Sequence, residues 1–93
     1  MTDLTVRDDV TASRYLVERD GEVLGFAAYR RADGVTTFTH TVVEPHHEGE
    51  GVGSALVRTA LDAERAAGRT IVARCPFVAA FVRRHPDYAD LVA

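Results

Sequence analysis

Three glycines at alternate positions, Gly49, Gly51 and Gly53, are the residues of this chain whose type and spacing point most clearly to chemistry. They follow a β-branched run at 35–43 and precede an amphipathic segment at 52–67, so they lie at a strand-to-helix junction. Glycine lets the backbone approach a ligand, and the free amides of a first helical turn point at it with the positive end of the helix dipole behind them. The junction therefore predicts an anion site, and a diphosphate is its natural ligand.

Two common nucleotide-binding motifs do not fit this junction. A Walker-type phosphate loop needs Gly-Lys-Ser/Thr, and all eleven basic residues of the chain are arginine. A dinucleotide fingerprint needs a third glycine where Ser54 stands, an acidic residue about 20 positions further on and a larger parallel sheet. The remaining interpretation is a diphosphate that is attached to another group and held by the amides of residues 49–54.

Cys75 and His40 are the candidates for group-transfer chemistry. Cys75 ends a short predicted strand and precedes a proline, so it stands at the start of a predicted helix, where the dipole stabilises a thiolate. His40 is expected to share a strand face with Phe38 and Val42. Packing is the alternative for both, because cysteine is among the most buried residue types and a histidine between threonines can simply hydrogen-bond to a neighbour.

Other conspicuous side chains favour structural roles. His46 and His47 form a solvated turn and lack partners at metal-ligand spacing, so no metal site is predicted. Phe77 and Phe81 are four residues apart on a predicted helix and are expected to pack in the core. Tyr88 is likewise expected to pack near the C-terminus.

Turn dipeptides and hydrophobic spacing indicate the elements that hold these residues. Asp20-Gly21 and Asp33-Gly34 predict tight turns between antiparallel strands, and apolar residues at helical spacing predict a helix that ends at Gly68. A strand, helix, strand run of this length is a right-handed crossover, so its two strands should be parallel neighbours. The expected elements are an edge strand or nothing at 4–6, strands at 13–19, 22–30 and 35–43, a helix at 52–67, a strand at 70–74 and a helix from Pro76 to Pro86.

Length and composition limit the class of protein. The 93 residues predict one α/β domain, 1–93, in which an antiparallel β-meander is followed by a right-handed β-α-β crossover and a C-terminal helix. A net charge of −3 offers no basic excess for nucleic acid. A single cysteine excludes an internal disulfide, and no apolar run is long enough for a membrane, so we expect a cytoplasmic protein without nucleic-acid or membrane partners.

Four segments of the chain resemble the GCN5-related N-acetyltransferase superfamily. The loop Glu48-Gly49-Glu50-Gly51-Val52-Gly53 is similar to the Arg/Gln-x-x-Gly-x-Gly/Ala loop that binds the pyrophosphate of acetyl-CoA in that superfamily. Three further segments, 39–43, 75–78 and 84–88, follow the order seen in its very small, predicted members. The resemblance spans residues 14 to 92 and implies a minimal version of that fold with a splayed sheet.

The resemblance implies acetyl-CoA as the acetyl donor and an unidentified amine, on a small molecule or a protein, as the acceptor. It places the pantetheine arm along the backbone of Val42 and Val43 toward Cys75. Either Cys75 accepts the acetyl group first, or the amine attacks the thioester directly with His40 as general base. The CoA-binding residues that it implies are Val42, Val43, Gly49, Glu50, Gly51, Val52, Gly53, Ser54, Phe81 and Arg84.

The head of the loop departs from the family pattern. Glu48 stands where Arg or Gln is usual, and Glu50 adds a second carboxylate near a dianionic ligand, which weakens CoA binding unless both side chains turn to solvent. A non-catalytic acyl-CoA-binding module is therefore the alternative function, while a small interaction domain leaves the glycines unexplained. Because so little chain lies outside the donor site, a shallow acceptor pocket is expected, formed near residues 30–34 or completed by a partner subunit. The sequence does not determine the oligomeric state.

Overall fold

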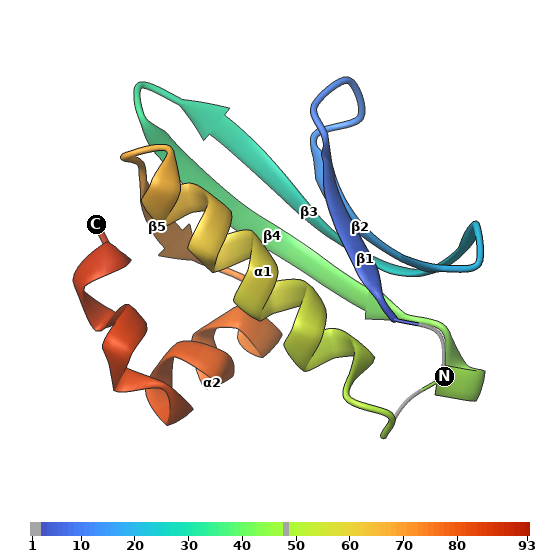
Figure 1. Cartoon of the computed structure of the whole chain (residues 1–93). Helices are drawn as coiled ribbons and strands as arrows, with labels where there is room; N and C mark the ends of the chain where they lie inside the picture. The colour runs from blue at the N-terminus through green and yellow to red at the C-terminus, as the bar shows by residue number, and fades with distance from the viewer. Residues whose placement is uncertain (1–2, 48) are drawn as a thin grey trace.

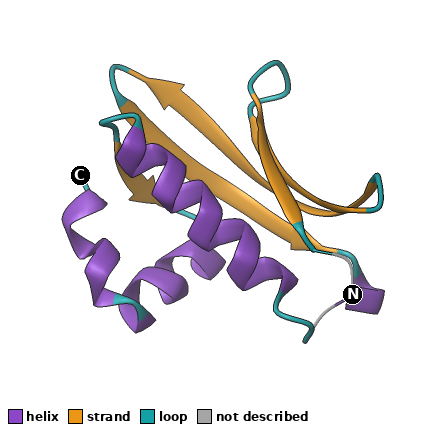
Figure 2. Cartoon of the chain, in the orientation of Figure 1, coloured by secondary structure: helices purple, strands orange, loops and turns teal. Residues whose placement is uncertain are grey.

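The computed structural model describes residues 3–47 and 49–93, which form a five-stranded sheet with helices packed on one face (Figure 1, Figure 2). The strands lie in the sheet in chain order, from β1 at one edge to β5 at the other. The elements are β1 Thr5–Asp9, β2 Arg14–Arg19, β3 Glu22–Ala32, β4 Val35–Val43, the 3-10 helix η1 Pro45–His47, α1 Val52–Ala66, β5 Thr70–Ala73, α2 Pro76–Arg84 and the 3-10 helix η2 Pro86–Leu91. This is the α/β fold class that the sequence predicts.

Strands β1 to β4 are antiparallel neighbours, and two of their connections are the predicted tight turns. Asp20 and Gly21 have φ of 53° and 79°, and Asp33 and Gly34 have φ of 53° and 78°. Two successive positive φ angles are what a type I′ hairpin turn requires, and Asp-Gly suits both positions. Strand β5 is parallel to β4 over four residue pairs, so the predicted strand-helix-strand crossover is confirmed.

A β-bulge at Thr39 changes which side chains of β4 face the helices. Tyr29 lies opposite Phe38 and Ala28 lies opposite His40, so Thr39 is an extra residue in the ladder. An extra residue shifts the in-out alternation of a strand by one position. Phe38 is 1 % exposed on the helix side, whereas His40 is exposed on the other face. The prediction that these two residues share a face is therefore wrong, because it assumed an unbroken alternation.

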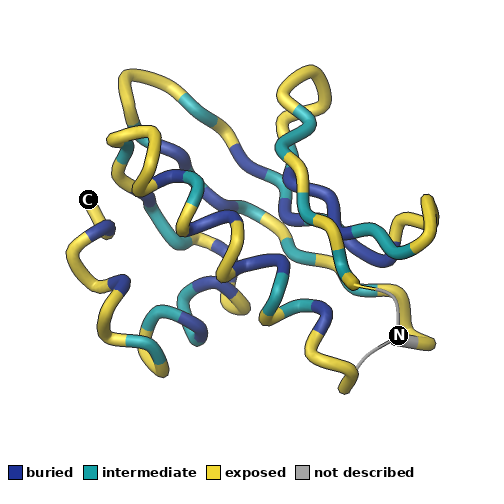
Figure 3. Tube along the Cα trace, in the orientation of Figure 1, coloured by how far each residue is buried: buried dark blue, intermediate teal, exposed yellow. Residues whose placement is uncertain are grey.

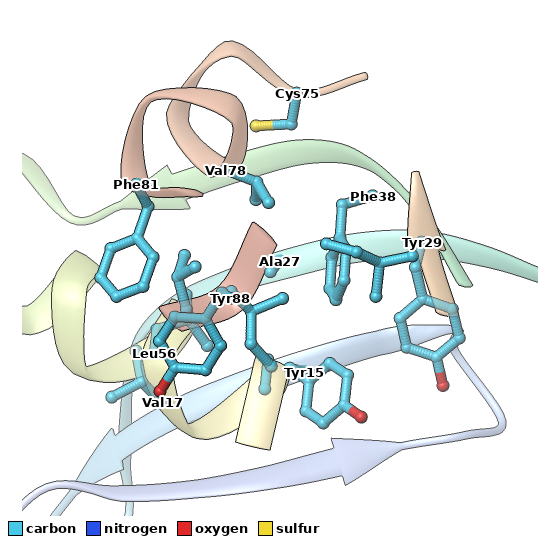
Figure 4. Packing of buried hydrophobic residues seen from close by; sticks show 14 of the residues in the cluster. Tyr15, Val17, Ala27, Tyr29, Phe38, Leu56, Cys75, Val78, Phe81 and Tyr88 are labelled. Atoms are coloured by element: carbon cyan, nitrogen blue, oxygen red, sulfur yellow. The ribbon is translucent and has the colours of Figure 1, made fainter. Parts of the chain in front are cut away.

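The hydrophobic core lies between the sheet and the helices (Figure 3, Figure 4). The rings of Tyr15, Tyr29 and Phe38 come from three adjacent strands, and their centroids lie 5.6 to 6.3 Å apart. Such aromatic contacts add to the stabilisation from burying the rings. Helix α1 covers them with one face that repeats at helical spacing, namely Val52, Leu56, Val57, Ala60, Leu61 and Glu64.

The ends of the two α-helices follow their local sequence. Helix α1 stops before Gly68, which has φ of 74° and donates its amide to the carbonyl of Arg65. Helix α2 begins with Pro76, whose missing amide costs nothing in a first turn, and the next proline, Pro86, opens η2. Within the described ranges, no helix is both long enough and apolar enough to cross a bilayer.

Candidate functional site

The start of helix α1 presents free backbone amides. Gly49 and Gly51 have φ of 86° and 79°, a left-handed region that costs other residues about 1–2 kcal/mol each. The amide of Ala55 donates to the carbonyl of Gly51 at 3.0 Å, which closes the first helical turn. The amides of residues 52–54 therefore have no partner within the helix. Together with the helix dipole they form a set of donors suited to an anion.

Strand β4 has an open edge beside this helix end. Strand β5 pairs with β4 only as far as Ala73, which lies opposite Phe38. The amides of Arg74 and Cys75 both donate to the carbonyl of Phe38, at 3.1 and 3.0 Å, and the chain then leaves the sheet to enter α2. Beyond Phe38, no described strand pairs with β4 on this side.

The pairing of β4 with β3 decides which residues face the open edge. The amide of Glu44 donates to the carbonyl of Leu24 at 2.7 Å. Because an antiparallel ladder alternates residue by residue, Val42 directs its amide and carbonyl toward β3, while Thr41 and Val43 direct theirs toward the open edge. An extended ligand can bind such an edge through main-chain hydrogen bonds. Of the two predicted residues, Val42 and Val43, only Val43 directs its main-chain groups toward the open edge, and Thr41 does so as well.

A cavity of about 450 Å³ connects the open edge of β4 with the start of α1. We call it the helix-side cavity. Its volume falls within the range of small-molecule and cofactor sites. The residues that line it are Thr41, Val43, Gly49, Gly51, Val52, Gly53, Ser54, Phe77 and Arg84.

Helix α2 supplies the opposite wall of the helix-side cavity. Phe77, in its first turn, is 42 % exposed and lies directly against Gly53, where an added Cβ would be only 2.6 Å from Cζ of the ring. Gly53 therefore leaves the space that the ring occupies. Arg84, in the last turn of α2, makes no side-chain hydrogen bond or ion pair with the residues that the structure describes. Its guanidinium is available for a phosphate.

Of the two loop carboxylates, only Glu50 lies among the described residues, and Glu48 lies outside them. An oxygen of Glu50 is 3.5 Å from Nη1 of Arg19, and the side chain does not belong to the lining of the helix-side cavity. Its charge is therefore drawn toward an arginine on β2. Among the described residues, no group of three or more His, Cys, Asp or Glu side chains is placed to hold a metal ion.

Cys75 lies just behind the wall of the helix-side cavity. It is the residue before the first turn of α2 and is 3 % exposed (Figure 4). Its thiol donates to Oγ1 of Thr41, with an Sγ–Oγ1 distance of 3.2 Å. Since Thr41 lines the cavity, Cys75 contacts the cavity wall but belongs to the core.

Three other predicted site residues lie away from the helix-side cavity. His40 is exposed on the far face of the sheet, with Nδ1 3.2 Å from Oγ1 of Thr39, and the bulge is the reason. Val42 is 48 % exposed on that same face. Phe81 is 4 % exposed, and its ring stacks on that of His85 with 4.0 Å between centroids. It belongs to the core and does not line the cavity.

Sequence reasoning missed two residues of the lining, Thr41 and Phe77. Thr41 lies two residues before Val43 in the same strand, so simple alternation places both side chains on one face, and the sequence alone indicates this. Phe77 was assigned to the core with Phe81, since residues four apart share a helix face. However, Phe77 stands at the very start of α2, where the helix projects toward the glycines, and its ring ends at Gly53.

A buried carboxylate network fixes α1 to the sheet. Glu64 is fully buried and accepts hydrogen bonds from Tyr15, Arg31, Thr36 and Arg69 at 2.5 to 2.7 Å. Burial alone would raise the pKa of this carboxyl, but the hydrogen bonds outweigh burial and lower the pKa to about 2. Sequence reasoning did not predict this network, which holds the helix that carries the glycine turn.

Comparison with known proteins gives one family and a shared fold. A family model described as GCN5-related N-acetyl-transferase matches residues 14–91. No curated protein matches the chain. Among solved structures, a presumed GCN5-like N-acetyltransferase from Staphylococcus aureus is 22 % identical, with a TM-score of 0.73 over 100 % of this chain and 91 % of that chain.

Two longer proteins share the fold over part of their length. The ribosomal-protein-alanine N-acetyltransferase of Brucella melitensis is 20 % identical, with a TM-score of 0.61 over 86 % of this chain and 60 % of its own. A presumed acetyltransferase of the GNAT family from Desulfovibrio desulfuricans is 23 % identical, with a TM-score of 0.55 over 64 % and 40 %. Identities this low carry the fold alone. The family match, however, runs from the start of β2 to the end of η2, and this chain therefore belongs to the GCN5-related N-acetyltransferase family.

Proposed function

We propose that this chain is a single-domain, acetyl-CoA-dependent N-acetyltransferase whose helix-side cavity binds the acetyl-CoA. The observation that carries the proposal is the meeting of two features in one cavity, the free amides of α1 and the open main-chain edge of β4. A coenzyme A molecule has two matching parts, a diphosphate and an extended arm of amide groups. The family to which the chain belongs supports the same ligand.

The residues of the cavity fit this ligand part by part. The amides of residues 52–54 and the guanidinium of Arg84 would hold the diphosphate. Thr41 and Val43 would pair with the pantetheine amides, and Phe77 offers an apolar wall for the methylene groups between them. The side chain of Glu50, drawn toward Arg19, leaves the diphosphate position without a facing carboxylate from that residue.

Acetyl-CoA, when bound, supplies an activated acetyl thioester. In the reaction, the amine nitrogen bonds to the acetyl carbon, the carbon–sulfur bond breaks, the nitrogen gives up a proton, and CoA leaves as a thiolate that takes up a proton. Of the two routes that the sequence leaves open, we favour direct attack by the amine. Cys75 is almost fully buried and its thiol is already engaged with Thr41, so it is poorly placed to accept an acetyl group.

A second candidate function is a non-catalytic acyl-CoA-binding module. The observation that favours it is the chemistry of the cavity lining, which contains two hydroxyl groups and an arginine but neither of the predicted catalytic residues, Cys75 and His40. We further propose that the chain belongs with the very small members of the family, on the strength of its length and its four motif segments. Turnover of acetyl-CoA separates the transferase from the module.

The test of the donor site is a matched pair of variants, Gly51→Asp and Gly51→Asn. Both side chains tolerate a positive φ and have nearly the same shape, and a Cβ at this position meets no atom within 4 Å. Only Asp adds a negative charge near the proposed diphosphate position. Two like unit charges about 8 Å apart repel each other by about 2 kcal/mol at an effective dielectric constant of about 20.

We expect calorimetric titration to show that Gly51→Asp binds acetyl-CoA at least about ten-fold more weakly than Gly51→Asn. Both variants should retain the far-ultraviolet circular dichroism of the wild type. Equal affinities would contradict the assignment of the diphosphate to this turn. Release of free CoA from the wild type in the presence of amines supports the transferase, and binding without release supports the module.

A further inference from the structure

A second cavity, of about 500 Å³, lies on the face of the sheet opposite the helices. We call it the far-face cavity. It is lined by Arg30 of β3, by Thr37 and Thr39 of β4 and by Arg74, which follows β5. Its lining thus contains two cations and two hydroxyl groups and no carboxylate. This composition is complementary to a small oxyanion.

The two arginines of the far-face cavity are free to bind a ligand. Neither Arg30 nor Arg74 makes a side-chain hydrogen bond or an ion pair with any residue in 3–47 or 49–93. Arginines elsewhere on the sheet are engaged, such as Arg7 with Glu18 at 2.6 Å and Arg31 with Glu64 at 2.6 Å. In a chain with a net charge of −3, two neighbouring arginines without acidic partners form a local positive potential.

The far-face cavity and the helix-side cavity meet at strand β4. Thr39 lines the first and Thr41 lines the second, on opposite faces of the same strand. At about 3.3 Å per residue, these two positions are about 7 Å apart along the strand. Strand β5 has already ended at Ala73, so no described strand closes the gap beside this part of β4. A molecule in the far-face cavity can therefore approach the end of a chain bound along the open edge.

From this placement we infer that the amine acceptor binds in the far-face cavity and carries a carboxylate or phosphate group held by Arg30 and Arg74. The inference rests on the proposed function and names the class of its second substrate, a small anionic amine. The volume of the cavity suits a small molecule rather than a folded partner. The short span from Thr39 to Thr41 calls for an amine only a few bonds from the anionic group.

His40 gains a place in this arrangement although it lies outside the helix-side cavity. It is on the same face of the sheet as the two arginines, and its Nδ1 is 3.2 Å from Oγ1 of Thr39, a residue of the far-face lining. An acceptor in that cavity would bring its amine near this imidazole. His40 would then take the amine proton from the acceptor side, as the nitrogen bonds to the acetyl carbon and the carbon–sulfur bond breaks.

The experiment compares charged and neutral amines of similar shape. Initial rates of CoA release are measured with acetyl-CoA and either β-alanine or β-alaninamide, and then with either phosphoethanolamine or ethanolamine, with rates corrected for the fraction of free amine. We expect kcat/KM to be at least about ten-fold higher for the anionic member of one pair, because charge-assisted hydrogen bonds are strong. The pair that shows the preference tells whether the group is a carboxylate or a phosphate.

Substitutions of the two arginines test whether they cause the preference for anionic amines. Arg30→Gln and Arg74→Gln should each raise KM for the anionic amine about ten-fold, so that the preference over the neutral amine is largely lost. Arg83→Gln is the matched control, since Arg83 is exposed, unpaired among the described side chains and outside both linings. A wild type that prefers neutral amines would overturn the inference, as would an anion preference that survives both substitutions.

A binding readout keeps this test separate from that of the proposed function. Titration of the ¹⁵N-labelled protein with β-alanine or phosphoethanolamine, without acetyl-CoA, should shift the amide resonances of Thr37 and Thr39 in the wild type and not in Arg74→Gln. Such shifts without any turnover would support an anion site while refuting the transferase. Turnover of neutral amines without such shifts would support the transferase while refuting the anionic acceptor.

Discussion

Replacing Glu64 by glutamine tests what holds helix α1, and with it the glycine turn, against the sheet. The carboxylate is fully buried and accepts hydrogen bonds from Tyr15, Arg31, Thr36 and Arg69. Glutamine has nearly the same shape, but it carries no charge and turns one acceptor into a donor that faces other donors. The two arginines would then lose their charged partner, and part of the network would be left unsatisfied.

The size of the effect follows from the pKa of Glu64. Burial alone would raise this pKa, but the hydrogen bonds from Arg69, Thr36, Tyr15 and Arg31 lower it from 4.5 to about 2. Since one pKa unit is equivalent to about 1.4 kcal/mol, the ionised carboxyl contributes about 3 kcal/mol of folding stability at neutral pH. The free energy of unfolding of such a domain is typically about 5–15 kcal/mol, so the loss should be large.

The sign of the pH dependence makes the prediction specific. A carboxyl whose pKa is lower in the folded state stabilises the fold above its unfolded pKa, and this contribution disappears as the pH falls from about 4.5 to about 2. Glu64→Gln has no such group to titrate. We therefore expect the difference in unfolding free energy between wild type and variant to be about 3 kcal/mol at pH 7 and to shrink steadily below pH 4.5.

Urea unfolding, followed by far-ultraviolet circular dichroism at several pH values, measures this difference. Glu44→Gln is the control, because Glu44 is exposed and its substitution should change stability by less than about 0.5 kcal/mol. A Glu64→Gln variant as stable as the control at pH 7 would refute the reasoning. So would a difference that stays constant down to pH 3, because the carboxylate charge would then not be its source.

Two further predictions concern the walls of the helix-side cavity. Gly53→Ala adds a Cβ 2.6 Å from the ring of Phe77, which must tilt toward the cavity, so acetyl-CoA affinity should fall about three- to ten-fold in calorimetry with little change in unfolding free energy. An unchanged affinity would mean that the ring does not border the ligand. Cys75→Ser keeps a donor for Thr41 and should retain turnover within about three-fold, with no acetyl mass on the wild-type protein by intact mass spectrometry. A protein-bound acetyl group that is absent from the variant would instead establish the acetyl-cysteine route.

Two of the turns and the positions of strands β2 to β5 could be predicted because local chemistry decides them. Asp-Gly pairs with positive φ angles fix the β2–β3 and β3–β4 hairpins, and the β-branched run at 35–43 forms a strand with the same limits. The start of α1 was equally readable, since glycines at positive φ precede a segment of helical periodicity. These features depend on a few neighbouring residues, so the sequence alone carries them.

The bulge at Thr39 could not be predicted in this way. Thr37, Thr39 and Thr41 recur at alternate positions of β4, and nothing in the sequence distinguishes Thr39 from the other two. The extra residue arises from the pairing of Tyr29 and Ala28 with β4, which is a property of two strands. Because the bulge was missed, His40 was assigned to the wrong face of the sheet, and Val42 with it.

The buried Glu64 was missed for a different reason. Its position in α1, three residues after Leu61 and four after Ala60, places it on the buried face by the same periodicity that predicts the core. A glutamate there would ordinarily argue against burial, because an unpaired buried charge is very costly. Its partners come from β2, β3, β4 and the residues after α1, and only the folded sheet brings Tyr15, Arg31 and Thr36 to one point.

The bulge also explains how so short a chain could serve two substrates. Without it, Thr39 and Thr41 would lie on one face of β4, the face opposite Phe38, and both would point away from the helices. With it, β4 contributes Thr41 to the helix-side cavity and Thr39 to the far-face cavity. In the proposed reaction, donor and acceptor would therefore meet across a single strand, beside the gap left by the end of β5. In that arrangement, the two arginines on the bare sheet face would supply the recognition chemistry of the acceptor pocket without a second layer of helices.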